Sequence, residues 1–212
     1  MADRGLLPKN ERSCLTFVVS KGEATKQAVL ERAAAIASRI GLAGLTIGSL
    51  ADDTGMSKSG LFAHFRSKEL LQAQVLAFAR QLFVDQVVRP ALAAPRGETR
   101  VRTLFEHWLG STKDRSSACL FVSASAEYDD QPGPIRDQLV RDHLDFADSV
   151  AQMFRTGISE GDFRRDADPE QFAHDVHGVM LAFFHASRLL GDPAAEARTR
   201  HAFEKLLADA RA

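Results

Sequence analysis

Apolar side chains along this chain recur mainly at the three- and four-residue spacing of amphipathic helices. Residues 25–40 show the pattern clearly, with apolar positions at Val29, Ala33 and Ile36. No segment of useful length alternates between apolar and polar residues, which is the pattern of a half-buried strand. The sequence therefore predicts an all-α protein.

Glycine, proline and capping residues interrupt this pattern and mark the ends of the helices. Gly41, Gly161 and Gly191 each follow an apolar segment, where a glycine can end a helix in the left-handed conformation. Asp168 and Asp192 each precede a proline, a combination typical of a helix start. The predicted helices cover residues 25–40, 47–54, 58–64, 67–90, 98–111, 117–127, 134–160, 168–190 and 192–210.

The most informative segment is residues 46–70, which contain two short helices joined by a tight turn and followed by a third helix. Thr46, Ser57 and Ser67 can each cap a helix, and Gly55 can form the left-handed turn. The connections are short enough to indicate a helix-turn-helix motif. The second short helix begins with small and basic side chains, which suit a groove of duplex DNA.

The charge distribution agrees weakly with such a motif. The net charge of the whole chain is −1, which does not by itself indicate nucleic-acid binding. Residues 21–70 contain seven Lys and Arg against five Asp and Glu, whereas residues 71–212 contain seventeen against twenty-one. This asymmetry favours a mildly basic head on an acidic body.

Cysteine content and hydropathy favour a cytoplasmic protein. Cys14 and Cys119 are too few for a disulfide framework and are interpreted as reduced thiols. No apolar run approaches the length of a membrane span, so no membrane partner is expected. The run Leu15–Val19 is too short for a signal peptide, and residues 1–22 are interpreted as a flexible tail.

The last two predicted helices are apolar over an arc too wide for a helix that is buried on one side. One explanation is the core of a monomer, and the other is an isologous four-helix interface with a second copy of the chain. We favour the homodimer, because helix-turn-helix proteins usually need a two-fold partner to read DNA. The residues assigned to this interface are Phe172, Val176, Val179, Met180, Phe183, Phe203, Leu206 and Leu207.

Residues 25–71 resemble the N-terminal DNA-binding domain of TetR/AcrR-type bacterial transcriptional regulators. The resemblance rests on Leu50-Ala51, Gly55-Met56-Ser57-Lys58-Ser59-Gly60, Phe62-Ala63-His64-Phe65 and Ser67-Lys68-Glu69-Leu70. Several capping, turn and aromatic positions agree in register over about a quarter of the chain, and the remainder agrees only in helical architecture. The resemblance implies a helix-turn-helix domain over residues 23–70 and a helical ligand-binding and dimerisation domain over residues 71–212.

The resemblance also implies which residues contact DNA. Ser57, Lys58 and Ser59 should face base edges or adjacent phosphates, and Gly60 should allow a close approach to the DNA backbone. The family mostly has a phosphate-binding Tyr where this chain has Phe62, so that hydrogen bond cannot form here. The complete set of implied DNA-binding residues is Thr46, Ser57, Lys58, Ser59, Gly60, Phe62, His64 and Lys68.

A small-molecule pocket in the helical body is a further implication of the resemblance. The residues that could line it, with histidines as polar anchors, are Phe105, Trp108, Phe121, Tyr128, His143, Phe146, Met153 and His177. A filled core is the alternative for each of them. An effector would have to favour one spacing of the two DNA-binding heads, with the helix over residues 67–90 as the lever.

Other classes of function find little support. No nucleophile elbow, glycine-rich phosphate loop or set of four metal ligands is present, so no enzyme activity, cofactor or metal site is assigned. His174 and His177 have a spacing that can bind a metal, but such pairs usually have a surface or core role. The prediction is a ligand-responsive homodimeric repressor that binds a palindromic operator. A ligand-binding or scaffolding helical bundle with weak or no DNA binding remains the alternative.

Overall fold

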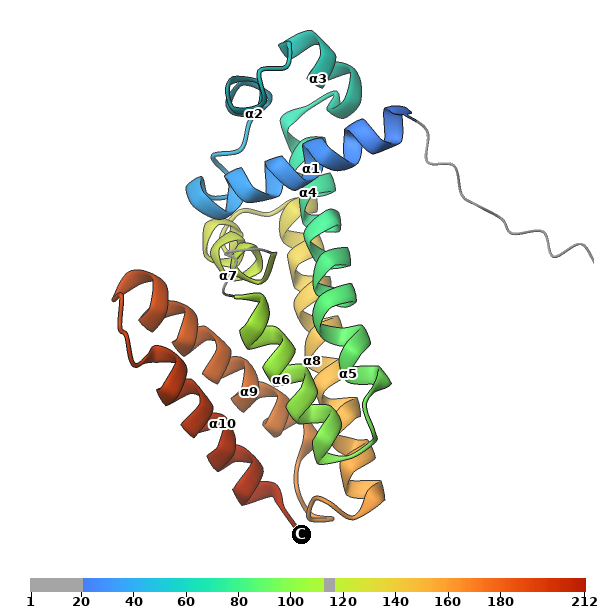
Figure 1. Ribbon diagram of the computed structural model, residues 1–212, viewed down its shortest axis with the longest axis vertical. Coiled ribbons are helices and arrows are strands. Elements are labelled where there is room, and N and C mark those ends of the chain that lie inside the picture. Colours follow the sequence, from blue (N-terminus) through green and yellow to red (C-terminus); the bar gives the residue numbers. More distant parts are fainter. Residues whose placement is uncertain (1–20, 113–116) are drawn as a thin grey trace, which may run out of the picture.

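The computed structural model describes residues 21–112 and 117–212, and within these ranges the chain is helical without a β-strand. Figure 1 shows a head, made of one long and two short helices, above an elongated helical body. The all-α prediction is confirmed. None of the described helices is long and apolar enough to span a membrane. The predicted tail contains residues 1–20 and Cys14, which lie outside the described residues.

The head consists of α1 (Lys21–Ile40), α2 (Ile47–Thr54) and α3 (Lys58–Phe65). Thr46 and Ser49 cap the start of α2 reciprocally, because each side-chain oxygen accepts the backbone N–H of the other. Gly55 ends α2 at φ +68°, and Ser57 Oγ accepts the Gly60 N–H at 3.1 Å. The caps and the turn predicted for the helix-turn-helix are confirmed.

The core of the head continues into the body without a break. Leu50, Leu61 and Phe65 are fully buried between the helices of the head. The same apolar cluster includes Leu120 and Tyr128 of α7 (Ser117–Tyr128). The head therefore packs directly on α7 as well as on α4 (Lys68–Phe83), the helix that follows it in sequence.

The fourth predicted helix runs past its expected end at Pro90. It comprises α4 (Lys68–Phe83), a π-turn η1 (Val84–Val88) and α5 (Arg89–Ala93). Pro90 has no N–H for the Gln86 carbonyl four residues earlier, and His107 Nδ1 lies 3.0 Å from that oxygen. The π-turn and this side-chain bond let the helix continue through the proline, which corrects the predicted end.

The body contains α6 (Glu98–Ser111), α7, α8 (Pro134–Glu160), α9 (Pro169–Phe184), a π-turn η2 (His185–Leu189) and α10 (Ala195–Ala210). The predicted bounds of α6 and α8 are confirmed. The last helix begins at Ala195 rather than at Asp192, because the Asp192 carboxylate accepts the Ala194 N–H in a preceding turn. In Figure 1, α9 and α10 form the outer pair of the body.

Most residues assigned to the dimer interface lie in the core of a single chain. Phe172, Val176, Met180, Phe203 and Leu207 are at most 9% exposed and belong to the apolar cluster of the body. This corrects the assignment for these five residues, because they hold α9 and α10 on their own chain. The other three, Val179, Phe183 and Leu206, are partly buried against the same cluster.

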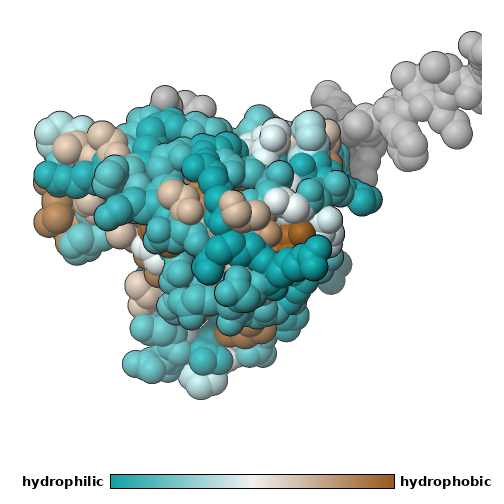
Figure 2. All heavy atoms as spheres, turned by 90° about the horizontal axis from the view of Figure 1, so that it is seen from below, coloured by the Kyte–Doolittle hydropathy of each residue, from teal (hydrophilic) through white to brown (hydrophobic). Residues whose placement is uncertain are grey.

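The lower end of the body offers no large apolar surface. Figure 2 shows this end covered mainly by hydrophilic residues, with small and separated hydrophobic patches. A self-association surface is therefore expected along the sides of the body rather than at this end.

Candidate functional sites: an exposed helix and a body cavity

Helix α3 presents one face to the core of the head and the other to solvent. Leu61 and Phe65 are fully buried and anchor the helix. Lys58 and Ser59 are exposed at its N-terminal end, and the Phe62 side chain is 57% exposed one turn later. A large apolar side chain with this exposure, beside a lysine and serines, suits contact with a partner rather than packing.

The remaining residues implied in DNA binding lie around this face and differ in how exposed and how hydrogen-bonded they are. His64 is partly buried, with its ring tilted against that of Phe65 at 6.2 Å between centroids. Lys68 is exposed at the start of α4. The Thr46 amide donates to Ser49 Oγ at 2.9 Å, so a phosphate contact by this N–H would first require that bond to open.

Basic side chains in the head fall into two groups. Arg32 and Arg39 both pair with Asp53, which ties α1 to α2 and holds the pKa of that carboxyl below its usual value, chiefly through the Arg32 hydrogen bond. Lys58 and Lys68 form no ion pair with any residue in the described ranges. Arg66, which ends α3 at φ +61°, is exposed and likewise has no ion pair there. Arg66 is not among the residues that the resemblance implies, and its exposure beside the start of α4 makes it a further candidate.

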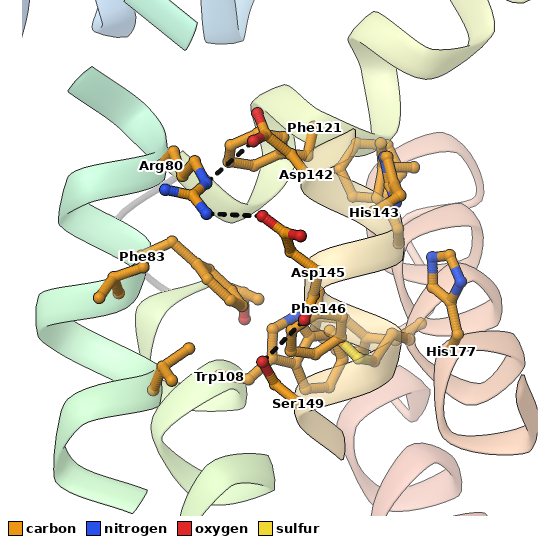
Figure 3. Close-up of a pocket in the computed structure, with 17 residues that line it drawn as sticks. Arg80, Phe83, Trp108, Phe121, Asp142, His143, Asp145, Phe146, Ser149 and His177 are labelled. Carbon is orange, nitrogen blue, oxygen red and sulfur yellow. Dashed lines mark hydrogen bonds and ion pairs between the residues drawn. The ribbon is translucent and has the colours of Figure 1, made fainter. Parts of the chain in front are cut away.

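A cavity of about 120 Å³ lies in the body, between α4, α6, α7, α8 and α9 (Figure 3). Five of the eight residues predicted for a pocket line it: Trp108, Phe121, His143, Phe146 and His177. Residues that the sequence reasoning did not assign to a pocket include Arg80, Phe83, Asp142, Asp145 and Ser149. Met180 and Phe183, assigned to a dimer interface, also line it.

Three predicted pocket residues, Phe105, Met153 and Tyr128, do not line this cavity. Phe105 stacks on Phe203 at 3.8 Å between ring centroids in the core of the body. Met153 is buried in the same core. Tyr128 is buried at the base of the head, where its hydroxyl donates to Gln72 Oε1 at 3.1 Å.

An ion-pair group forms one end of the cavity. Arg80 binds Asp142 Oδ1 through Nε at 2.9 Å and Asp145 Oδ2 through Nη2 at 2.8 Å, as Figure 3 shows. The Asp142 side chain is only 4% exposed, whereas those of Arg80 and Asp145 are 44% and 61% exposed and face solvent. Burial raises the pKa of Asp142, and hydrogen bonding from Gln138 and the charge of Arg80 oppose that rise.

Two histidines line the cavity on the side of α9. The rings of His143 and His177 are 5.4 Å apart between centroids, and His143 Nε2 lies 2.7 Å from Ser125 Oγ. Burial lowers the pKa of both side chains, which favours neutral rings. No three potential metal ligands cluster within residues 21–112 and 117–212.

Helix α7 connects the cavity to the head. Phe121 and Val122 line the cavity, and at the end of the same helix Glu127 accepts the Leu42 and Ala43 N–H groups at 3.2 and 2.6 Å. Gln72 adds a second link by donating to the Leu42 carbonyl at 2.7 Å. Contacts over such sequence separations have no local signal, so they could not be read from the chain.

Comparisons with known proteins agree with this arrangement. Residues 29–75 match the family described as bacterial regulatory proteins, tetR family, and residues 97–203 match the tetracyclin repressor-like C-terminal domain. No curated protein matches the chain. A TetR-family regulator from Cytophaga hutchinsonii is a similar solved structure, with 18% identity and a TM-score of 0.80 over 91% of this chain and 98% of that one.

Two other solved structures of the same fold contain ligands. AibR, in complex with isovaleryl coenzyme A and operator DNA, is 23% identical, with a TM-score of 0.65 over 84% of this chain and 97% of that one. A putative transcriptional regulator from Saccharomonospora viridis, in complex with choline, is 22% identical, with a TM-score of 0.73 over 91% of this chain and 100% of that one. From the family matches, which together cover the head and most of the body, the chain belongs to the TetR family of DNA-binding bacterial transcriptional regulators.

Proposed function

We propose that the protein is a homodimeric repressor that inserts α3 of each subunit into the major groove of a palindromic operator. The exposure of α3 carries this proposal. Lys58, Ser59 and Phe62 are exposed, while Leu61 and Phe65 fix the helix from behind. An anchored helix that projects its N-terminal side chains is the geometry by which helix-turn-helix proteins read bases.

The unpaired basic residues have separate roles in this proposal. Lys58, at the start of α3, reaches base edges or the phosphates beside them. Lys68 and Arg66, around the start of α4, bind the phosphate backbone together with the first amide groups of that helix. Phe62 contacts sugars and thymine methyl groups through its exposed ring.

The homodimer forms through the outward faces of α9 and α10. His174, Gly178, Leu181 and His185 are exposed and recur at helical spacing along α9 and η2, and we name them the outer stripe. A Cβ atom at Gly178 would meet no atom within 4 Å, so a second helix can approach closely there. This stripe supports an isologous helix pair without using the buried residues of either core.

The cavity in the body binds the effector, and α7 transmits the signal. A ligand that moves Phe121 or Val122 displaces α7, and Glu127 carries the change to Leu42 and Ala43 in the head. Operator affinity changes only if the ligand prefers one placement of the heads. The ligands bound to AibR and to the Saccharomonospora viridis regulator support effector binding within this fold.

Selection from a random duplex library tests the DNA-binding proposal. The purified full chain should enrich a palindromic sequence, and its affinity for that duplex should fall steeply with salt because bound phosphates release counterions. Sedimentation of the complex should give two chains per duplex. Failure to enrich any sequence, with only salt-insensitive DNA binding, would favour a ligand-binding or scaffolding bundle instead.

A further inference from the structure

The hydroxyl groups around the cavity have already used their hydrogen-bond donors. Ser149 donates to the Asp145 carbonyl at 2.7 Å, and Thr112 donates to the Leu109 carbonyl at 2.7 Å. A hydroxyl carries a single proton, so these two groups can offer a ligand only acceptor oxygens.

Arg80, the positively charged side chain at the cavity, is also already bound in ion pairs. Arg80 binds both Asp142 and Asp145, so the three ionised groups together carry one net negative charge. An anionic ligand at Arg80 would lie beside two carboxylates and would have to displace at least one of them. The ion-pair end of the cavity therefore opposes anions, although it contains an arginine.

Acceptor capacity remains in the buried carboxylate. Arg80 and Gln138 both donate to Asp142 Oδ1, at 2.9 and 2.7 Å. Oδ2 of the same carboxylate is buried and has no hydrogen-bond partner within the described residues. An unpaired buried acceptor costs about 1–3 kcal/mol, more when it is charged, and a ligand that donates to it recovers part of that cost.

Aromatic rings form the rest of the lining. The Phe83 ring packs edge-on against Phe146 and Phe121, at 5.3 and 6.4 Å between centroids. Trp108 packs edge-on against Phe183 at 5.5 Å. These rings can hold an apolar ligand body, and their faces attract a cation.

We propose that the effector is a protonated hydrophobic amine, with its ammonium group at Asp142 and its apolar body among the aromatic rings. The ammonium lies against the Asp142 and Asp145 carboxylates and balances the negative charge that Arg80 leaves, and a small turn of the Asp142 side chain brings its unpaired Oδ2 to the ligand. This assignment of a ligand class rests on the proposed function, in which the cavity is the effector site.

Trp108 provides a direct readout, because it is the only tryptophan in the chain and lines the cavity. Its fluorescence is titrated with 2-phenylethylamine, 2-phenylethanol and 3-phenylpropanoate, which share a phenyl ring and differ in charge. The amine should bind at least tenfold more tightly than the alcohol, and the carboxylate most weakly. A carboxylate or alcohol that binds as tightly as the amine overturns the proposal, as does a lack of response to all three.

Asp142→Asn removes the charge while keeping the side-chain shape. It should weaken amine binding at least tenfold and leave alcohol binding unchanged. Asp148→Asn, an exposed position on the same helix that does not line the cavity, is the matched control and should change neither. If the Asp142 variant binds the amine as tightly as wild type, the proposed role of Asp142 is wrong. If the variant does not fold, the titration of wild type with the three probes still tests the ligand class.

A parallel operator titration separates this inference from the proposed function. Saturating 2-phenylethylamine should weaken operator binding at least threefold. If the amine binds at Trp108 without any effect on operator affinity, the effector role of the cavity is wrong. If operator binding is intact but no amine binds, the ligand class is wrong while the DNA-binding function stands.

Discussion

Phe62 is the residue in α3 that departs most clearly from the TetR pattern. Its ring is 57% exposed, so an added hydroxyl would have room and would project towards bound DNA. We predict that Phe62→Tyr tightens operator binding about 5- to 150-fold, because one new hydrogen bond to a phosphate in each of the two subunits contributes about 0.5–1.5 kcal/mol. Fluorescence anisotropy with a labelled operator measures the change, and Phe62→Leu, which adds no hydroxyl, should not tighten binding.

Glu98 makes the stability of the body depend on pH. Its carboxylate binds Arg211 and Arg102, and the Arg211 hydrogen bond is the main cause of a pKa of about 2. A lowered carboxyl pKa stabilises the folded state above the unfolded pKa near 4.5, and this contribution is lost as the pH falls from about 4.5 to about 2.

Glu98→Gln should therefore lower the free energy of unfolding at pH 7 by about 1–2 kcal/mol and flatten its decrease towards acid. Urea unfolding at a series of pH values checks both effects. An unchanged acid slope in the variant would show that other carboxylates control it.

Single residues differed in how well the sequence could predict them. The caps at Thr46, Ser57 and Ser67 depend on neighbours within three residues, so they were predictable. The link between Arg80 and Asp142 joins positions 62 residues apart in sequence and depends on how α4 and α8 pack. Tyr128 lies outside the cavity, and its position could not be predicted because its partner, Gln72, lies on a distant helix.

Gly97, which immediately precedes α6, occupies a position that only glycine fits. Gly97 has φ +91°, and a Cβ atom there would overlap the Asp162 carboxylate, which accepts the Glu98 N–H at 2.8 Å. Gly97→Ala should lower the free energy of unfolding by about 2–3 kcal/mol through backbone strain and loss of this cap.

Gly110 provides the control in the same helix. A Cβ atom there would meet nothing within 4 Å, so Gly110→Ala should be neutral or stabilise by about 0.5–1 kcal/mol. Thermal unfolding distinguishes the two variants. Equal midpoints would contradict the structural role of Gly97.

Helix α7 should determine how firmly the head is held. Glu127→Gln replaces a charged acceptor of the Leu42 and Ala43 N–H groups by a weaker neutral one. We predict faster hydrogen exchange at these two amides and weaker operator binding, with little change at α10. If hydrogen exchange at the Leu42 and Ala43 amides is unchanged, α7 does not transmit the effector signal to the head.

Whole elements were predicted well where local signals mark both ends. The bounds of α6 and α8 agree with the prediction because Gly97 precedes α6, while Pro134 begins α8 and Gly161 ends it. The helix through Pro90 was predicted to end too early, since the π-turn and the His107 bond to Gln86 depend on tertiary packing. The Asp192-Pro193 pair led to a predicted start of α10 that is too early, because a turn precedes the helix and α10 begins at Ala195.

The molecule as a whole explains the wide apolar arc of α9. One side of the helix packs on the core through Phe172 and Val176, and another lines the cavity through Met180 and Phe183. The sequence pattern revealed this burial but could not distinguish the chain's own core and cavity from a partner subunit. The proposed dimer therefore uses the outer stripe, which a hydrophobicity pattern does not reveal because it contains histidines and glycine.

The most direct test of the account compares Lys58→Ala and Lys68→Ala with wild type, by selection from a random duplex library and by salt titration on the enriched operator. Lys58→Ala should cost about 1–3 kcal/mol per half-site and relax the preference at one base pair of each half-site. Lys68→Ala should weaken binding to all sequences about equally and reduce the salt slope by about two, because the dimer loses one phosphate contact in each subunit. Arg165→Ala, an exposed basic residue between α8 and α9, should change neither. Wild-type affinity and base preference in both lysine variants would contradict DNA reading by α3.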